Sequence, residues 1–366
     1  MKKTGILYIQ KDGIMGGSAM SLQMLIRAVK KEYDLHVLFC EKGPFYDQLK
    51  RSGVPLLFIP FRAWRKVKYF IRNISAVFQL RKIIKEKGIS VVHSNSYEVN
   101  PLMVLACQKR TRTICHVRDF ITRSKARKFF LHRADRVIAV SRAVRDQFRD
   151  LHQDISVIYN GVSVRSAAQA QDSLSGRFPR IKRAFKAGLI GQCEERKRQE
   201  DFVRAGLEVL QKDAAIHFFL IGGHHTEYGD RIKQLIRHHQ AHFHFIDPVK
   251  DILPVIKGLN AVVISSREEA FGRTAIEAMA CGRPVIASSV GGLAEIISHK
   301  RTGLLYPCND HKALAGLILE LKRDRKLYCK LVHNGLLHVK KNFTEEQYIR
   351  KIRELYSRVL AKDGVS

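Results

Sequence analysis

Short apolar runs alternate with amphipathic segments along nearly the whole chain. In its first half, most of these runs are separated by segments with helical spacing, such as 21–31 and 100–110, and the runs begin at residues 6, 35, 54, 89, 112, 136 and 155. Short β-rich runs bounded by polar or turn residues are typical of buried strands. Strands that alternate with helices predict a parallel sheet with crossover helices. We therefore expect a first α/β unit over residues 1–165.

The alternation stops and then begins again. Residues 166–182, SAAQAQDSLSGRFPRIK, are small and polar and contain glycine and proline, so we interpret them as a linker. Beyond them, helical segments such as 200–212, 231–239 and 272–280 separate apolar runs that begin at residues 185, 216, 243, 261, 284 and 303. A second α/β unit is expected over residues 183–342. The tail has helical periodicity, and residues 343–366 are expected to form a helix that packs back on the first unit.

The charge of the chain is strongly positive. It has 65 Lys and Arg against 34 Asp and Glu, and the first 170 residues alone hold 32 against 12. This balance predicts an anionic partner, which can be nucleic acid, a phosphorylated substrate or an anionic membrane surface. Residues 61–72 and 123–136 interleave aromatic residues with cations, which suits an anionic bilayer. An ordinary basic, solvated helix remains the alternative for both segments.

Cysteine usage and hydropathy indicate where the protein works. The seven cysteines form no CxxC pair, and most lie inside apolar runs, so a reducing cytoplasm fits better than a disulfide framework or a metal site. No stretch approaches the ~20 apolar residues that cross a bilayer. The N-terminus resembles a weak signal peptide, but Asp12 closes its short apolar run, which favours a first buried strand. We expect a cytoplasmic protein. A peripheral position on the inner face of the cell membrane is compatible with the same observations.

The stretch EEAFGRTAIEAMACGRPVIAS, residues 268–288, carries candidate chemistry. Glu269 and Glu277 flank a Phe271-Gly272 turn that follows a predicted strand and precedes a predicted helix. Ligands bind at the carboxyl ends of parallel strands, and helix N-termini hold phosphates. A carboxylate accepts two hydroxyl hydrogen bonds, which suits the vicinal diols of ribose or hexose. The stretch therefore predicts a nucleotide-sugar site, although Thr274 and Glu277 also match a capping box.

The same stretch resembles the signature of the family-4 retaining glycosyltransferases. The matching positions are Glu269, Phe271, Gly272, Glu277-Ala278-Met279-Ala280, Gly282, Pro284-Val285-Ile286-Ala287, Gly291-Gly292 and Glu295. The resemblance implies an α/β protein with the GT-B fold, in which two Rossmann-like domains face each other across a cleft. It implies that the C-terminal domain binds a UDP- or GDP-linked sugar. The implied acceptor is a lipid-linked molecule or polysaccharide of envelope glycan biosynthesis, bound by the N-terminal domain.

The resemblance also implies a diphosphate clamp. Family members usually carry a basic residue just after the glycine that ends the first strand of the second domain, and a lysine about five residues later. Here Gln192 follows Gly191, and Lys197 takes the lysine position. Gln192 can donate a hydrogen bond but carries no charge, so Arg196 and Arg198 are candidates to compensate.

Further roles come from the same resemblance. Glu269 is expected to orient the sugar and to stabilise an oxocarbenium-like charge, with Glu277 holding the ribose. The remaining donor-binding positions in the second domain are Phe271, Gly272 and Arg273 around the phosphates and Val249 near the base.

In the first domain, Gly16 and Gly17 follow the first strand and resemble the glycine turn near the donor phosphate. An N-cap at Ser18 is the alternative. His116 ends another strand and resembles the histidine that lies close to the transferred sugar, while a buried structural histidine is the alternative. The turn at residues 160–162, Asn-Gly-Val, resembles the one that closes the first domain.

Several other chemistries are disfavoured. No Asp-x-Asp pair follows a strand in a metal-binding context, so neither a metal nor another cofactor is expected. The leaving phosphate would then help to deprotonate the acceptor. The spacing of His238, His239, His242 and His244 does not match a zinc site and is interpreted as a basic surface. Two alternatives stay open: a sugar-nucleotide epimerase of the same fold, and a basic nucleic-acid-binding protein, for which no recognition motif is found.

Overall fold

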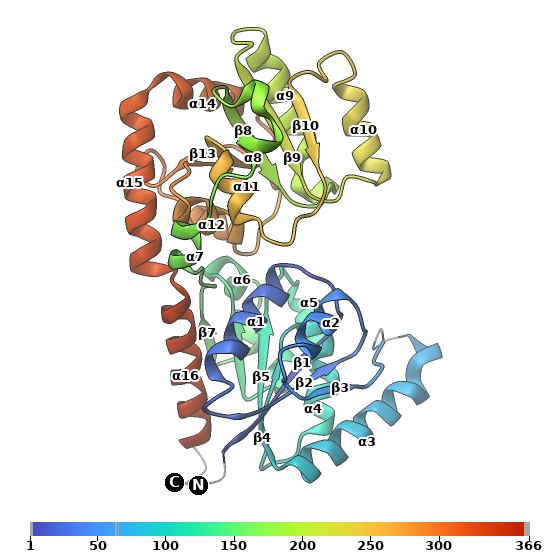
Figure 1. Ribbon diagram of the computed structural model, residues 1–366. Coiled ribbons are helices and arrows are strands. Elements are labelled where there is room, and N and C mark those ends of the chain that lie inside the picture. The colour runs from blue at the N-terminus through green and yellow to red at the C-terminus, as the bar shows by residue number, and fades with distance from the viewer. Residues whose placement is uncertain (1–2, 63, 65, 362–366) are drawn as a thin grey trace. The chain divides into compact units, whose positions relative to one another are not determined.

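The computed structural model describes residues 3–62, 64 and 66–361, and the chain forms two compact units. Unit 1 comprises Met1–Asn160 and Glu346–Ser366, and unit 2 comprises Gly161–Glu345. Each unit has its own parallel sheet with helices packed on it (Figure 1). The chain passes from one unit to the other at Asn160, a few residues before the linker expected at 166–182.

Among the described residues, unit 1 contains a seven-stranded parallel sheet in the order β3-β2-β1-β4-β5-β6-β7. Residues of the central strands are buried on both faces, which explains why their sequences read as continuous apolar runs. The strand order reverses between β1 and β4. The strands are β1 (Gly5–Gln10), β2 (Asp34–Phe39), β3 (Leu56–Phe58), β4 (Ile89–Ser94), β5 (Arg112–Val117), β6 (Arg136–Ala139) and β7 (Ile155–Val157).

The last helix of the chain belongs to unit 1. Tyr348, Ile352 and Tyr356 of this helix are buried in the same core cluster as Tyr8 of β1. The Tyr356 hydroxyl donates a hydrogen bond to the Tyr8 hydroxyl over 3.0 Å. The helices of unit 1 are α1 (Gly17–Val29), α2 (Pro44–Lys50), α3 (Phe70–Lys87), α4 (Asn100–Ala106), α5 (Arg123–Lys128), α6 (Arg142–Asp146) and α16 (Glu345–Ala361), with short 3₁₀ turns η1 (Val67–Tyr69), η2 (Tyr97–Val99), η3 (Leu131–Arg133) and η4 (Arg149–Leu151).

Unit 2 contains a six-stranded parallel sheet, within the described residues, in the order β10-β9-β8-β11-β12-β13. Its strand order reverses between β8 and β11. Both sheets are parallel and alternate with helices, so the two Rossmann-like units expected from the sequence are confirmed. The strands are β8 (Phe185–Ile190), β9 (Ile216–Ile221), β10 (Phe243–Ile246), β11 (Ala261–Ile264), β12 (Val285–Ser288) and β13 (Leu304–Tyr306).

The segment expected as a linker is folded into unit 2. Ala167 and Leu174 are buried, and Leu174 packs so closely on Gly258 that a Cβ there would lie 2.6 Å from the Leu174 Cβ. The sequence did not indicate this packing, because the segment is mostly polar and only a few apolar side chains make the contacts. The helices of unit 2 are α7 (Val164–Gln169), α8 (Leu174–Arg177), α9 (Gln199–Leu210), α10 (Glu227–Leu235), α11 (Leu253–Gly258), α12 (Arg273–Ala280), α13 (Gly291–Ile296), α14 (His311–Arg323) and α15 (Arg325–Asn342), with η5 (Pro179–Ile181) and η6 (Glu195–Lys197).

The length and the hydropathy of a helix determine whether it can span a membrane. Over the described residues, no helix is both long enough and apolar enough to span a bilayer.

Candidate functional site

Two loops of unit 2 start at the point where the strand order of its sheet reverses. The loop after β8 carries Lys197, and the loop after the neighbouring strand β11 carries Glu269. In open parallel sheets, the carboxyl ends of the two strands at such a reversal form a binding crevice. The sheet topology therefore brings together two residues that are 72 positions apart in the sequence.

Lys197 and Glu269 form an ion pair. The ammonium nitrogen of Lys197 lies 2.6 Å from Glu269 Oε2, and the two side chains are 19% and 15% exposed. Ser266 Oγ lies 3.4 Å from the same carboxylate oxygen. A charge-assisted hydrogen bond of this length is strong, and partial burial limits its screening by solvent. Both charges lie at the strand ends, and each is offset by the other.

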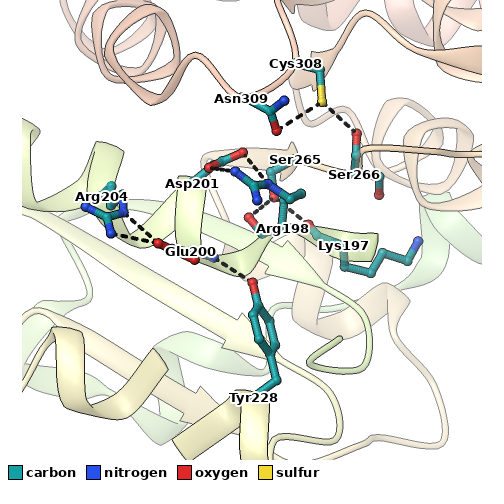
Figure 2. Close-up of polar contacts among 10 residues, drawn as sticks. All are labelled: Lys197, Arg198, Glu200, Asp201, Arg204, Tyr228, Ser265, Ser266, Cys308 and Asn309. Atoms are coloured by element: carbon teal, nitrogen blue, oxygen red, sulfur yellow. Dashed lines mark hydrogen bonds and ion pairs between the residues drawn. The ribbon is translucent and has the colours of Figure 1, made fainter. Parts of the chain in front are cut away.

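The backbone around Lys197 is tied to the end of β11. Ser265 Oγ lies 2.8 Å from the carbonyl oxygens of both Lys197 and Arg198 (Figure 2). Arg198 adopts a left-handed conformation, with φ of 54°, in which a residue other than glycine is uncommon. These contacts hold the loop in a single arrangement, which aims the Lys197 side chain.

The arginines beside Lys197 have partners of their own. The Arg198 guanidinium lies 2.7 Å from the carboxylate of the buried Asp201, and this contact raises the pKa of Arg198. In Figure 2 the side chains of Arg198 and Lys197 extend in different directions. The exposed Arg196 pairs with Glu194 at 2.7 Å. Each guanidinium is therefore already paired with a carboxylate. Neither is unpaired in a way that would let it replace the basic residue that family members usually carry at the position of Gln192.

The start of α12 depends on two glycines. Gly272 is the N-cap residue and has φ of +98°, in the region that favours glycine. Gly292 N donates a hydrogen bond to Glu269 O over 2.9 Å, and a Cβ on Gly292 would lie 2.6 Å from Phe271 Cα. The second glycine of the Gly291-Gly292 motif thus allows α13 to approach the loop that carries Glu269.

Glu277 lies one turn into α12 and is held by Arg273. The Arg273 guanidinium donates to Glu277 Oε1 over 2.8 Å, and both side chains are largely buried. Within the described part of the chain, Gly272 rather than Thr274 is the N-cap, and no side chain bonds to the cap. The capping-box interpretation of Thr274 and Glu277 is therefore wrong, because Thr274 already lies inside the helix.

The remaining expected positions of unit 2 also follow strands. Gln192 is exposed just after β8, and its carbonyl oxygen accepts a hydrogen bond from Gln199 Nε2 over 2.8 Å. Val249 is exposed in the loop after β10. The Phe271 side chain is buried, with its ring centroid 6.1 Å from that of Phe343. Phe271 can therefore offer a ligand its backbone but not its ring.

The expected positions of unit 1 are separate from this set. Gly16 and Gly17 are exposed at the start of α1, and Gly16 is the N-cap. The alternative with Ser18 as N-cap is therefore wrong. In the portion that the structure describes, no side chain caps this helix, which leaves its first N–H groups free of a side-chain acceptor.

His116 is enclosed in unit 1 instead of lying at its surface. Its ring, on β5, stacks on His93 with centroids 5.5 Å apart, and Tyr356 of α16 packs against His93. Burial lowers the pKa of His116 well below its ordinary value, so the imidazole is neutral. Its Nε2 has no hydrogen-bond partner among the described residues. The expected contact of His116 with a sugar is thus not available from this position.

Sequence reasoning missed the polar network around Arg118. The guanidinium lies 2.7 Å from Asn95 Oδ1, 3.0 Å from Asn160 Oδ1 and 3.2 Å from His116 Nδ1. Asn95 Nδ2 also donates to Gln10 Oε1 over 2.8 Å. These residues lie at or just beyond the carboxyl ends of β1, β4, β5 and β7, so the polar residue that ends each apolar run was the available signal.

The histidine-rich segment of unit 2 is only partly a basic surface. His242 and His244 stack on His217, with centroids 5.1 Å and 5.3 Å from it. Burial lowers the pKa of His244 to about 4 and also lowers the pKa of His217. The basic-surface interpretation is therefore wrong for His244, whose imidazole is neutral at pH 7, whereas His238 and His239 are exposed.

One group of side chains is close enough to share a metal ion. Among the residues described, His224, His225 and Asp247 offer ligand atoms that all lie within 4.8 Å of one another, on the loops after β9 and β10. However, His224 Nδ1 lies 3.1 Å from the carbonyl oxygen of Gly222, which requires a proton on that nitrogen. Only Nε2 of His224 is therefore left as a metal ligand, and the other two members of the group, His225 and Asp247, are exposed.

Comparison with known proteins identifies both units. The profile described as "Glycosyltransferase Family 4" matches residues 15–166, and the profile described as "Glycosyl transferases group 1" matches residues 184–324. An uncharacterized glycosyltransferase of Methanocaldococcus jannaschii is 27% identical over 365 residues, which cover 93% of this chain and 94% of the relative. The lipopolysaccharide core mannosyltransferase LpcC of Rhizobium leguminosarum is 28% identical over 241 residues, covering 64% of this chain and 67% of the relative.

Solved structures agree with the fold. The Anabaena protein HepE, solved in complex with UDP and glucose, superposes with a TM-score of 0.84 at 20% identity, covering 96% of this chain and 99% of that protein. This similarity concerns the fold, while the family profiles cover residues of both units. The chain therefore belongs to the group 1 glycosyltransferases of the family-4 type and has the GT-B fold.

Proposed function

We propose that this glycosyltransferase moves a sugar from a UDP- or GDP-linked donor to a lipid-linked or polysaccharide acceptor of envelope glycan biosynthesis, with retention of anomeric configuration. The observation that carries the proposal is the Lys197–Glu269 pair at the strand reversal of unit 2, beside the start of α12. The similarity to a lipopolysaccharide core mannosyltransferase and to a fold solved with UDP and glucose supports the same donor and acceptor classes.

Lys197 has the chemistry of a diphosphate ligand. Its ammonium group is paired with Glu269, and a bound diphosphate would compete with that carboxylate for it. The N–H groups at the start of α12 add partial positive charge. Preorganised charges of this kind stabilise the negative charge that develops on a leaving phosphate. Glu269, released from Lys197, would accept sugar hydroxyl groups and stabilise an oxocarbenium-like charge.

The nucleoside is assigned to the neighbouring positions. Glu277, oriented by Arg273, would accept the hydroxyl groups of the ribose. Gln192 would donate a hydrogen bond to the diphosphate, and the backbone near Val249 would meet the base. In unit 1, the exposed N–H groups at Gly16 and Gly17 would donate hydrogen bonds to a phosphate group.

We assign His116 a positioning role, which differs from the contact first expected. The buried imidazole accepts from Arg118 at Nδ1, so it helps to set the direction of the guanidinium at the edge of the unit 1 sheet. Because the Nδ1 lone pair takes part in this contact, the ring must carry its proton on Nε2.

The mechanism assigned to the site needs neither a protein nucleophile nor a metal ion. Attack from the front face, with the leaving phosphate taking the acceptor proton, would retain the anomeric configuration. Lys197 and the α12 amides would offset the phosphate charge. Turnover is therefore expected to survive treatment with a chelator, and a loss of turnover that Mg²⁺ or Mn²⁺ restores would contradict this assignment.

A donor screen followed by product analysis tests the proposed function. Thermal unfolding with a panel of UDP- and GDP-linked sugars should reveal a donor that raises the melting temperature. NMR of the transferred sugar should then show the anomeric configuration of the donor. Free nucleotide should appear only when an acceptor is present, whereas conversion of the donor sugar without an acceptor would favour an epimerase instead.

A further inference from the structure

Helix α3 and the preceding turn η1 expose large apolar side chains to solvent. Five of them have exposed fractions between 39% and 89%: Val67, Phe70, Ile71, Ile74 and Phe78. Singly exposed apolar residues are ordinary, but a contiguous apolar patch on a protein surface marks an interaction site. The concentration of such residues on one element therefore requires an explanation.

These five side chains share one face of the helix. Their positions follow the spacing i, i+3, i+4, i+7 and i+11, which places residues on a single stripe of an α-helix. A different stripe of α3, which includes Ala76, Leu80 and Ile84, is buried and attaches the helix to unit 1. Figure 1 shows α3 at the periphery of the unit, beside α4. The helix thus has two apolar faces, of which the fold of unit 1 covers one.

Cations border the exposed face. Residues 66–87 contain seven Lys and Arg and a single acidic residue, Glu86. Helical spacing places Lys68, Arg72 and Lys82 along one side of the apolar stripe, and Lys68 and Arg72 are exposed near the start of the helix. An apolar stripe bordered by cations is the pattern of helices that lie in the surface of anionic membranes.

Several of the aromatic residues first expected to contact a membrane pack against other rings of unit 1. Phe61 is buried, and the Trp64 ring stacks on it with centroids 6.2 Å apart. In the second basic segment, Phe129 packs edge-on against Tyr97 at 5.3 Å, and Phe130 against Trp64 at 5.7 Å. The surface available to a bilayer is therefore the α3 face, and it includes aliphatic positions beyond residue 72.

We propose that the exposed face of η1 and α3 docks on an anionic lipid bilayer, with its apolar side chains at the acyl boundary and its cations on lipid phosphates. A second copy of the chain is a poor occupant, because it would bring two sets of like charges together. The inference rests on the proposed function in one respect only, namely that a lipid-linked acceptor would be presented at the same surface.

Vesicle binding by the full chain tests the proposal. The protein should co-sediment with phosphatidylcholine–phosphatidylglycerol vesicles at low salt, bind pure phosphatidylcholine vesicles far more weakly, and be released by high salt. The triple variant F70S/I71S/F78S should lower the partition coefficient at least about 10-fold. The matched control is Leu337→Ser on α15 of unit 2, where an exposed leucine lies outside the proposed face and binding should not change.

A variant that removes three cations tests the electrostatic contribution to vesicle binding. K68Q/R72Q/K82Q should weaken binding to the mixed vesicles on the order of 100-fold, since each cation near an anionic surface contributes separately. The thermal shift produced by UDP or GDP should be the same in all variants and wild type, which separates membrane docking from donor binding. Equal binding of wild type and the apolar triple variant would overturn the proposal. So would a concentration-dependent dimer, measured by light scattering, that the triple variant abolishes.

Discussion

Lys197 Nζ and Glu269 Oε2 are 2.6 Å apart at the carboxyl edge of unit 2, on loops that leave the two strands between which the sheet order reverses. The pair is mostly shielded from water, so each charge is compensated mainly by the other. Removing one partner leaves the other charge uncompensated. In the proposed function, a diphosphate would compete with the Glu269 carboxylate for the Lys197 ammonium group, which would couple donor binding to the release of Glu269.

The first prediction concerns turnover. Lys197→Ala and Glu269→Ala should each lower kcat on the order of 10²-fold or more, because preorganised charge at the reacting groups is lost. The double variant should be less impaired than the product of the two single effects, since residues in direct contact are not additive. Steady-state kinetics of the purified variants measures both effects.

The control for these variants is Lys300→Ala. Lys300 also pairs with a carboxylate of unit 2, Glu320, at 2.8 Å, but this pair is exposed and lies outside the proposed site. An exposed pair contributes about 0–1 kcal/mol to stability, so turnover should stay at the wild-type level. Wild-type turnover in both Lys197→Ala and Glu269→Ala would refute the assigned roles.

The second prediction separates donor binding from chemistry. Glu277→Gln keeps the shape of the side chain but removes the charge that Arg273 and the ribose hydroxyls would share. A hydrogen bond to a charged group contributes about 1.5–3 kcal/mol, so the KM for the donor should rise at least about 10-fold with kcat changed only slightly. Glu320→Gln serves as the control. A fall in kcat at unchanged KM would move Glu277 from the nucleoside to the reacting centre.

The third prediction tests the close approach of α13 to the Glu269 loop. Gly292→Ala should destabilise unit 2 by about 1–3 kcal/mol, as overpacking does, and should also lower turnover by displacing the loop. Gly316→Ala on α14 is the matched control, because a Cβ there meets open space and alanine favours a helix by roughly 0.5–1 kcal/mol. The melting temperature should therefore fall in Gly292→Ala and rise in Gly316→Ala. Turnover should fall in Gly292→Ala only.

The fourth prediction concerns acid stability. Burial lowers the pKa of His93 to about 3, that of His244 to about 4 and that of His116 well below its ordinary value. In the unfolded chain these imidazoles take up protons near pH 6.5, which the folded chain does not, so stability is present above that pH and falls as the pH drops below it. Each histidine should contribute a slope of about 1.4 kcal/mol per pH unit.

Urea unfolding between pH 7 and pH 5 measures this slope. The exposed His238 offers a control, since His238→Gln removes an exposed imidazole and no buried one and should leave the slope nearly unchanged. A free energy of unfolding that stays constant from pH 6.5 to pH 5 would show that the buried histidines titrate equally in both states.

Local pattern was sufficient for most of the architecture. Every apolar run singled out in the sequence is a strand, because a strand buried on both faces needs a continuous apolar run between polar turns. The run of residues from Glu269 to Glu295 could also be recognised, since it matches the family signature. The strand pattern and the left-handed cap at Gly272 depend on neighbours in the sequence, whereas the close approach of Gly292 to Phe271 is a contact between two segments.

What the amino-acid sequence determined by itself was thus the class of fold, the strands and the family signature. The tertiary structure alone decided which charged side chains form ion pairs and which surfaces remain exposed to solvent. Lys197 finds Glu269 only because strand order places β8 beside β11, and His116 is enclosed by His93 on a neighbouring strand, with Tyr356 of the last helix packed behind it. The fold likewise decided that the apolar side chains of Phe70, Ile71 and Phe78 on α3 are exposed. Burial and pairing depend on contacts between distant segments, and no local pattern encodes those contacts.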